Sequence, residues 1–279
     1  MAEITAEAVR ALRAKTDLPL MDCKRALTES NGDETLAIEI LRKAGLKAAT
    51  KRADNATDEG KFFLATLPDG SAASLVEVLC ESAPVAKSDD FILFGTQCAA
   101  QLLNGPGAAN SEELLAQPNP ANPSQKLSDL QLDVINRLRE KIVAGRIWKV
   151  AGPVGGYVHH DGKTASFFQA SGAGTKLDVL KDVAMQVTAM QPRVTLSAEL
   201  DPALVSTERD RLMEEGKATG KPVNIVEKMV EGRLKTFYRD NGVLVEQQSV
   251  KEDTKTVGKA LSDAGFEAVG FKRLVLGKP

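Results

Sequence analysis

The stretch KFFLATLPDGSAASLVEVL, residues 61–79, contains two strand-like runs on either side of Pro68-Asp69-Gly70. This arrangement predicts a β-hairpin, because these three residues together favour a tight turn between strands. A helical pattern follows from Asp89 or Asp90 to Leu103. The same order recurs about 95 residues later, which predicts two related modules. Its elements are expected at 156–160 (strand), Asp161-Gly162 (turn), 164–170 (strand) and 175–190 (helix). Ordinary packing of helices on strands also produces such an order, so this alternative stays open.

The segments that flank the repeat predict further helices. Asp201-Pro202 places a capping residue before a proline that suits the first helical turn. Gly220-Lys221-Pro222 combines a helix stop with a second start, so an antiparallel helical hairpin is expected over 198–237. The remaining elements are expected at 105–123 (a long loop), 127–143 (a helix), 257–264 (a helix) and 268–276 (a strand that completes the sheet).

The first fifty residues have the pattern of three short helices. Pro19 separates the first helix from the second, and Asn31-Gly32 turns the chain before the third. Asp33 is suited to cap the third helix, and Gly45-Leu46 is suited to end it. The polar residues 51–59 have no apolar period, so they predict a linker that leaves this small helical domain mobile.

These patterns together predict an α+β protein with a helical domain followed by a core of two modules. The expected boundaries are 1–53 for the helical domain, 54–145 for the first module, and 146–279 for the second module with its hairpin.

Composition argues against several functions. Lys and Arg total 36 and Asp and Glu total 38, a net charge of −2, so the chain has no excess of positive charge to attract nucleic acid. Aromatic residues are only 4%, which disfavours stacking on single strands. Cys23, Cys80 and Cys98 have neither disulfide-framework nor zinc-site spacing. The start of the chain lacks an apolar run, and no stretch reaches the roughly 20 apolar residues of a membrane span. We therefore expect a cytoplasmic protein that needs no cofactor or metal.

Two segments have a superficial likeness to catalytic motifs. The glycines of residues 171–176 are spaced differently from both the P-loop and the dinucleotide fingerprint, so we expect a simple turn. His159 and His160 are adjacent, and neighbours in a strand point to opposite faces, so they are a poor chelating pair. A surface or interface role for them is favoured over catalysis. Cys23 is expected to be a packing residue.

Several ordered motifs closely resemble the bacterial translation elongation factor Ts family. The N-terminal signature corresponds to residues 12–16, 21–27 and 31–33. Further matches are Gly220-Lys221-Pro222, Ile225, residues 227–233, Tyr157-Val158-His159 and Thr256-Val257-Gly258. The resemblance covers nearly the whole chain. It implies a ubiquitin-associated-like helical domain, and a guanine-nucleotide exchange factor that acts on the GTPase elongation factor Tu.

The same resemblance implies where this partner is bound. Arg13, Leu20, Met21 and Lys24 match residues by which the helical domain grips the GTPase. The alternative for Leu20 and Met21 is that they merely close the core of that domain. Further interface residues are expected at Ser82, Ala83, Pro84, Val85, Leu138 and His159.

The chain departs from the family at three places. An Asp-Phe pair that the family points towards the magnesium site of the GTPase is replaced by Ala83 and Pro84, and Phe91 is a candidate substitute wedge. Asp17-Leu18-Pro19 stands where small, glycine-rich residues are usual, which predicts a stiffer approach to the second helix. Arg139 replaces the usual glycine. Apart from these three places, we expect the additional C-terminal helix of longer members to be absent, because the given sequence continues only briefly after Leu276.

Other functions stay open beside nucleotide exchange. An adaptor or chaperone would hold the GTPase without accelerating exchange, and an enzyme would use the glycine loop near Gly172. We expect no direct contact with nucleic acid or membrane, and a weak homodimer is also left open.

Overall fold

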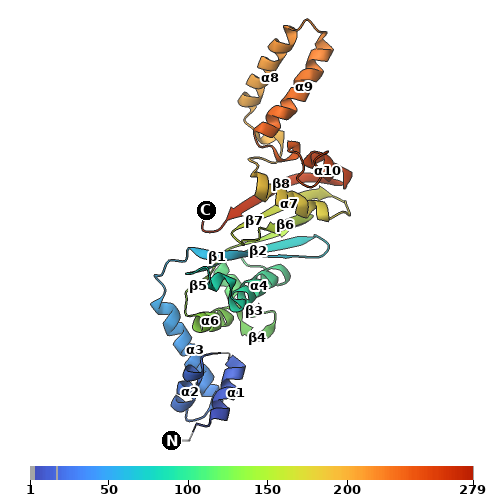
Figure 1. Cartoon of the computed structure of the whole chain (residues 1–279). Coiled ribbons are helices and arrows are strands. Elements are labelled where there is room, and N and C mark those ends of the chain that lie inside the picture. Colours follow the sequence, from blue (N-terminus) through green and yellow to red (C-terminus); the bar gives the residue numbers. More distant parts are fainter. Residues whose placement is uncertain (1–3, 17, 279) are drawn as a thin grey trace.

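The computed structural model describes residues 4–16 and 18–278. The chain is elongated, with the N-terminal helices at one end, stacked sheets in the middle and a helical hairpin at the other end (Figure 1). Residues 1–3 and Asp17, which bear on the expected absence of a leader and on the stiffened 17–19 segment, lie outside the described residues.

The N-terminal domain consists of α1 (Ala6–Thr16), α2 (Leu20–Glu29) and α3 (Glu34–Lys51), as the sequence predicts. The expected end of α3 at Gly45-Leu46 is wrong, because the helix continues to Lys51. Gly45 instead lies close to α6: a Cβ there would lie 3.2 Å from Nδ2 of Asn136, a tight contact. The core of the domain comprises Val9, Leu12, Leu18, Cys23, Ala26, Leu27, Ala37 and Leu41, which confirms the packing role of Cys23.

The first module is built on an antiparallel sheet of order β1-β2-β5. Its strands are β1 (Glu59–Thr66), β2 (Ala72–Cys80) and β5 (Ile142–Ala151). Two helices, α4 (Asp89–Asn104) and α6 (Leu127–Leu138), pack on one face and bury a core around Phe91, Phe94, Leu102 and Val134. The hairpin and α4 are therefore confirmed.

Two expectations for the first module are wrong. The segment 105–123 is not a plain loop: it contains α5 (Ser111–Leu115), capped by Asn110, and β3 (Pro118–Asn119), which pairs with β4 (Asn122–Lys126). Helix α6 ends at Leu138 rather than near residue 143. The next residue, Arg139, has a φ of 59°, and this left-handed conformation ends the helix before β5 begins.

The second module repeats the arrangement of the first. Its sheet has the order β6-β7-β8, formed by β6 (Val154–Val158), β7 (Thr164–Gly172) and β8 (Phe266–Val275). In each module the third strand pairs antiparallel with the second strand of the hairpin. The helices α7 (Asp178–Met190) and α10 (Val257–Asp263) cover the outer face around Phe168, Leu180 and Leu261.

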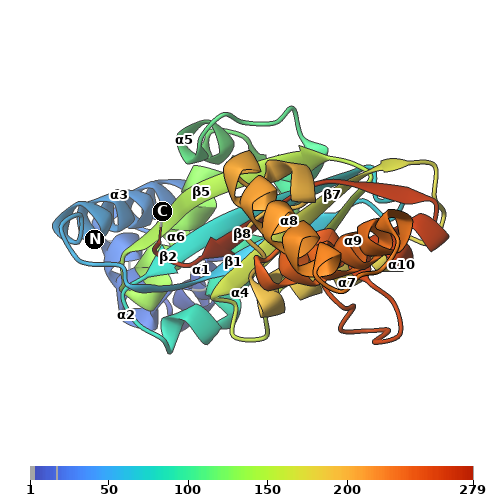
Figure 2. The ribbon, with the colours of Figure 1, turned by 90° about the horizontal axis from the view of Figure 1, so that it is seen from above.

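The sheets of the modules pack against each other through the faces that the helices leave open. Phe62 and Leu75 of the first sheet meet Val154, Phe167 and Leu274 of the second in one buried apolar cluster. The result is a layered arrangement of helices, sheet, sheet and helices, with the strands overlapping in the view of Figure 2.

The predicted hairpin is confirmed and projects from the second module (Figure 1). It consists of α8 (Pro202–Lys217), capped by Asp201, and α9 (Val223–Asp240), and short turns η2 (Ser197–Glu199) and η3 (Leu244–Glu246) lie at its base. Its helices meet through Leu212, Val226, Val230 and Leu234. Close packing requires Gly216, because a Cβ there would lie 2.4 Å from Val226.

Candidate partner-binding surface

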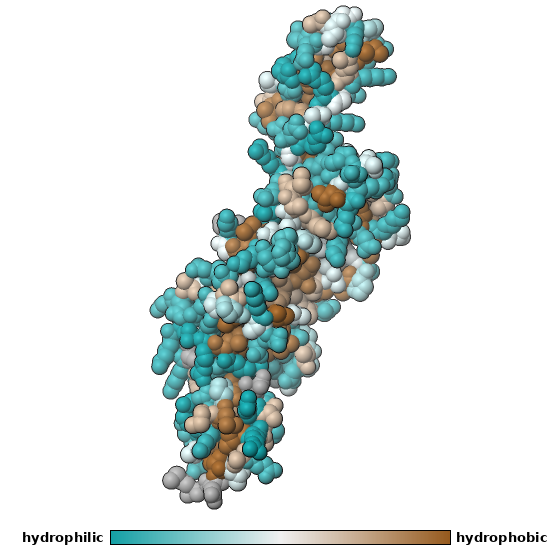
Figure 3. All heavy atoms as spheres, in the orientation of Figure 1, coloured by the Kyte–Doolittle hydropathy of each residue, from teal (hydrophilic) through white to brown (hydrophobic). Residues whose placement is uncertain are grey.

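The start of α2 presents apolar side chains to solvent. Leu20 is 45% exposed and Met21 is 70% exposed, whereas Cys23, Ala26 and Leu27 of the same helix are buried. The interpretation that Leu20 and Met21 close the core is therefore wrong. Hydrophobic side chains are visible at the surface of this domain, at the lower end of the molecule in Figure 3.

Exposed charged side chains occur on α2 and on the neighbouring helix α1. Lys24 follows Met21 by one helical turn and is exposed, so both lie on one side of α2. Arg13 is exposed on the neighbouring helix α1. Exposed side chains of this kind affect association rate and specificity more than affinity.

The loop after β2 presents a second surface. Ala83 and Pro84 are exposed, whereas Val85 is half-buried and packs against the core of the first module. Pro84, with φ of −61° and ψ of −43°, starts the turn η1 (Val85–Lys87), and Ser88 then caps α4. The exposed part of this loop is therefore held between a strand and a helix.

Phe91 does not serve as a substitute wedge. It is fully buried and its ring centroid lies 5.8 Å from that of Phe63. The residues that follow it on α4, Ile92 and Leu93, are 38% and 44% exposed. Neither residue was predicted to lie at the surface, although three consecutive large apolar residues in one helix cannot all face the same core. They add apolar surface close in sequence to Pro84.

The short segment between α6 and β5 connects these surfaces. Arg139 forms an ion pair with Asp22, the neighbour of Met21 in α2. Glu140 accepts hydrogen bonds from the backbone nitrogen of Ser82 at 3.0 Å and from its hydroxyl at 2.5 Å. Consecutive residues thus hold both α2 and the Pro84 loop.

The linker is also fixed to this segment. The backbone nitrogen of Lys141 donates to Glu81 at 2.6 Å, and its Nζ donates to the carbonyl of Asn55 at 2.9 Å. Arg52 and Asn55 donate to the same Glu81 carboxylate at 3.1 Å and 2.8 Å. One ion pair, between Arg52 and Glu81, and hydrogen bonds between residues far apart in sequence therefore connect the linker to the first module, so the linker is more than an unattached polar segment.

These contacts shift the acidity of Glu81. Burial alone would raise its pKa, but the backbone nitrogen of Lys141 and the side chains of Asn55 and Arg52 hold the pKa below its ordinary value of 4.5. Burial raises the pKa of the neighbouring Cys80 thiol to about 11. That thiol therefore stays protonated near neutral pH and is a poor nucleophile.

Leu138 packs against an apolar core, whereas His159 lies beside a polar side chain. Leu138 is half-buried and packs against the core of the first module, so it presents little free surface. His159 is half-buried just after β6, and its Nδ1 lies 3.3 Å from the hydroxyl of Tyr157. The expectation that the histidines face opposite ways is wrong: the rings of His159 and His160 lie 4.2 Å apart, because β6 ends at Val158.

The turn after His159 lies at the same end of the sheets as the Pro84 loop. Gly162 accepts a hydrogen bond from the nitrogen of Phe62, and Lys163 pairs with Glu59 at 2.8 Å. Glu59 lies opposite Cys80, where β2 ends and the loop begins. The structure thus brings His159 and residues 82–85 to one edge.

The glycine loop is confirmed as a turn. A Cβ at Gly172 would lie 2.5 Å from the carbonyl oxygen of Gly265, and one at Gly174 would lie 2.3 Å from that of Ala264. The glycines therefore allow close packing against the chain before β8, and α7 begins only at Asp178. Within residues 4–16 and 18–278, no group of three or more His, Cys, Asp or Glu side chains is placed to hold a metal ion. Nor does that part of the chain contain a helix long and apolar enough to span a bilayer.

A family model and curated relatives both match this chain to elongation factor Ts. Residues 84–278 match the model of a family described as Elongation factor TS. Elongation factor Ts of Hyphomonas neptunium is 35% identical over 285 residues, which covers 100% of this chain and 93% of the relative. Elongation factor Ts of Paenarthrobacter aurescens is 38% identical over 287 residues, covering 99% of this chain and 100% of the relative.

Proposed function

Because this chain belongs to the elongation factor Ts family, we propose that it binds elongation factor Tu in the GDP-bound form and promotes GDP release during translation elongation. The proposed role is non-enzymatic, because exchange makes no covalent bond. We also propose that the protein acts in the cytoplasm. A factor that prefers the nucleotide-free GTPase must weaken GDP binding by the same coupling free energy. By the same linkage, incoming GTP helps to expel the factor.

The exposure of Leu20 and Met21 is the main structural support for this proposal. Apolar side chains of this size at a helix start are suited to a partner surface, and methionine adapts its shape to the partner. Arg13 and Lys24 add charge around them. We propose that this part of α2 provides most of the affinity.

The Pro84 loop is proposed to act on the nucleotide site. Ala83 offers no carboxylate there, and the nearby Glu81 and Glu140 are engaged by Lys141 and Ser82. The loop would therefore displace backbone of the GTPase as a rigid wedge, without a carboxylate to compete for magnesium. The ion pair of Arg139 with Asp22 supports simultaneous action of the loop and α2.

Stopped-flow release of labelled GDP tests the proposal. Elongation factor Tu of the same organism, loaded with labelled GDP, is mixed with micromolar protein and excess unlabelled GDP. We expect release to accelerate with protein concentration. Unchanged release, with binding of the GTPase confirmed separately, would overturn exchange as the function.

An adaptor or chaperone role is the second candidate, and the Ala83-Pro84 sequence favours it. A loop without an acidic or aromatic side chain is less suited to disturb a magnesium site than the Asp-Phe pair of the family. Equilibrium binding to elongation factor Tu with an unchanged GDP off-rate is the result that this role predicts.

A further inference from the structure

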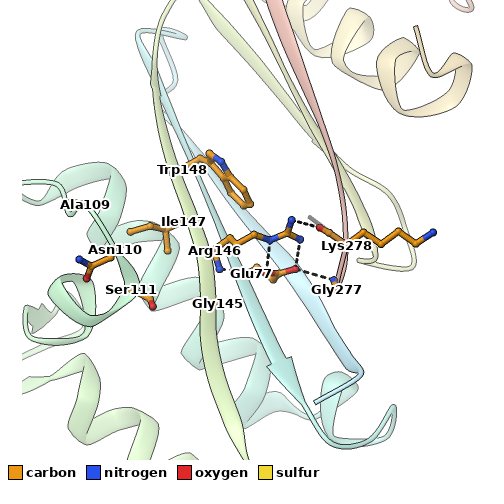
Figure 4. Close-up of a pocket in the computed structure, with 10 residues that line it drawn as sticks. All are labelled: Glu77, Ala109, Asn110, Ser111, Gly145, Arg146, Ile147, Trp148, Gly277 and Lys278. Atoms are coloured by element: carbon orange, nitrogen blue, oxygen red, sulfur yellow. Dashed lines mark hydrogen bonds and ion pairs between the residues drawn. The ribbon is translucent and has the colours of Figure 1, made fainter. Parts of the chain in front are cut away.

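Glu77 in β2 and Arg146 in β5 form an ion pair at the boundary between the modules (Figure 4). Nε and Nη2 of Arg146 donate to the two carboxylate oxygens of Glu77 at 2.8 Å and 2.6 Å. Glu77 is only 3% exposed. Such a two-pronged contact fixes the mutual orientation of the groups more strictly than a single hydrogen bond does.

A bulge in the sheet sets the direction of Arg146. Val76 pairs with Ile147 and Val78 pairs with Ala144, so Gly145 and Arg146 together lie opposite Glu77. A bulge of this kind re-aims side chains relative to a regular strand. Gly145 is also required by space, because a Cβ there would lie 2.9 Å from Oε2 of Glu77.

The remaining contacts of the pair reach the end of the second module. Nη2 of Arg146 donates to the carbonyl of Val275 at 2.9 Å, and Nη1 donates to the carbonyl of Lys278. The backbone nitrogen of Gly277 donates to Oε1 of Glu77 at 3.1 Å. Burial alone would raise the pKa of Glu77, but Arg146 and Gly277 hold it below the ordinary value of 4.5.

Directional contacts matter at this boundary because the rest of the interface is apolar. The cluster around Phe62 and Phe167 holds the sheets together, but apolar burial has no preferred direction. Trp148, the single tryptophan of the chain, lies at the same boundary. Its ring centroid is 5.4 Å from Cζ of Arg146 and 5.2 Å from Nζ of Lys272 in β8.

We propose that Glu77 and Arg146 are positioning residues that fix the second module on the first, and that nucleotide exchange depends on this orientation. The dependence on exchange rests on the function proposed above. The pair lies apart from the Pro84 loop and from α2, and acts by fixing where β8 lies relative to the first sheet. The surfaces of the two modules can then meet the GTPase in one arrangement.

A distance measurement between the modules tests the positioning claim. Spin labels are placed at Glu112→Cys in α5 and Glu267→Cys in β8, because both residues are exposed and the native Cys23, Cys80 and Cys98 are buried. We expect one narrow distance distribution in the parent chain, and a broader or shifted one in Arg146→Met and Glu77→Gln. An unchanged distribution in both variants would overturn the proposal.

Trp148 emission and GDP release complete the test. Glu77→Gln leaves the Arg146 guanidinium in the chain. A shift of the Trp148 fluorescence emission in this variant would therefore report that the guanidinium has moved from its place at the Trp148 ring. We expect about tenfold slower GDP release for Arg146→Met and Glu77→Gln at a temperature where they are folded. A role in stability alone would lower the melting temperature but leave the release rate of folded protein unchanged, and that result would overturn the proposal.

Two further variants test whether the changes come from loss of these contacts rather than from misfolding. Lys278→Ala is the matched control, because only the backbone carbonyl of Lys278 contacts Arg146, so parent-like behaviour is expected. A chain ending at Leu276 removes the contacts of residues 277 and 278 without altering a strand, and the same changes are expected in weaker form. If the parent chain itself fails to accelerate release, the proposed function fails, while the distance measurement still decides the positioning claim.

Discussion

Ser82 is tied to Glu140 through both its backbone nitrogen, at 3.0 Å, and its hydroxyl, at 2.5 Å. The two residues lie 58 positions apart in the sequence. Their contact closes the base of the loop that exposes Ala83 and Pro84. Because the acceptor is a carboxylate, both hydrogen bonds are charge-assisted and hold the loop more firmly than neutral ones would.

Replacing Glu140 should loosen this loop. We expect Glu140→Ala to lower the free energy of unfolding by about 1 kcal/mol, since water can reach the freed Ser82 groups, and to slow GDP release. Glu140→Gln, which keeps an acceptor oxygen, should have a smaller effect on both. Urea unfolding and stopped-flow release measure these effects. Equal release rates for the parent chain and Glu140→Ala would show that the loop needs no such anchor.

The left-handed backbone at Arg139 gives a second prediction. Its φ of 59° suits glycine, and a residue with a Cβ carries a cost of about 1 kcal/mol there. Arg139→Gly and Arg139→Ala both lose the ion pair with Asp22, but only the glycine variant relieves the backbone. Arg139→Gly should therefore be about 1 kcal/mol more stable than Arg139→Ala in urea unfolding. Arg25→Ala is the control, because it also removes a partner of Asp22 but lies within α2. Equal stability of the two Arg139 variants would contradict the prediction.

Met21 is expected to contribute to binding but not to stability. Because its side chain is 70% exposed, Met21→Ala should change the free energy of unfolding by less than about 0.5 kcal/mol. Dissociation from elongation factor Tu should become about tenfold faster, since interface mutations act mainly on the off-rate. Met190→Ala, at a methionine 53% exposed on α7, is the matched control. Surface plasmon resonance with immobilised GTPase separates the two rates, and an unchanged off-rate would contradict the proposed role of Met21.

Pro84, in contrast to Met21, is expected to contribute more to the rate of GDP release than to binding affinity. Pro84→Ala keeps the turn η1 but removes the exposed ring, so we expect the maximal rate of GDP release to fall more than the affinity does. Titrating the factor in the release assay gives both the maximal rate and the half-saturating concentration. Similar losses of rate and affinity from Met21→Ala and Pro84→Ala would contradict separate roles for these residues.

Local sequence signals predicted the elements that depend on local chemistry. Pro68-Asp69-Gly70 marks the first hairpin and Asp201-Pro202 starts α8, because turn and cap preferences act over a few residues. Gly45 misled for the opposite reason. Gly45 lies close to Asn136 in α6, which is far away in the sequence. A contact between residues so far apart leaves no local sequence pattern.

In the candidate surface too, features set by local sequence could be predicted, whereas features set by tertiary contacts could not. The motif containing Met21 indicated α2 as a binding element, and the absence of zinc-site spacing favoured a packing role for Cys23, which is buried. The burial of Phe91 could not be predicted, because its neighbours Ile92 and Leu93 are equally apolar and only the packed sheet decides which one faces inward. The links from Arg139, Glu140 and Lys141 to α2, the loop and the linker also depend on tertiary structure.

The acid sensitivity of the linker follows from Glu81. Because its pKa is lowered in the folded chain, its contacts contribute stability above the ordinary value of 4.5, and that contribution is lost as the pH falls through the lowered pKa. Glu81→Gln should therefore be less stable than the parent chain at pH 7, and the difference should shrink steadily below pH of about 4.5. Urea unfolding from pH 7 to pH 3 measures it. Glu112→Gln, at an exposed residue of α5, controls for the general effect of removing a carboxylate. A difference between the parent chain and Glu81→Gln that stays constant over this range would show that Glu81 is not held by Arg52, Asn55 and Lys141 in its charged form.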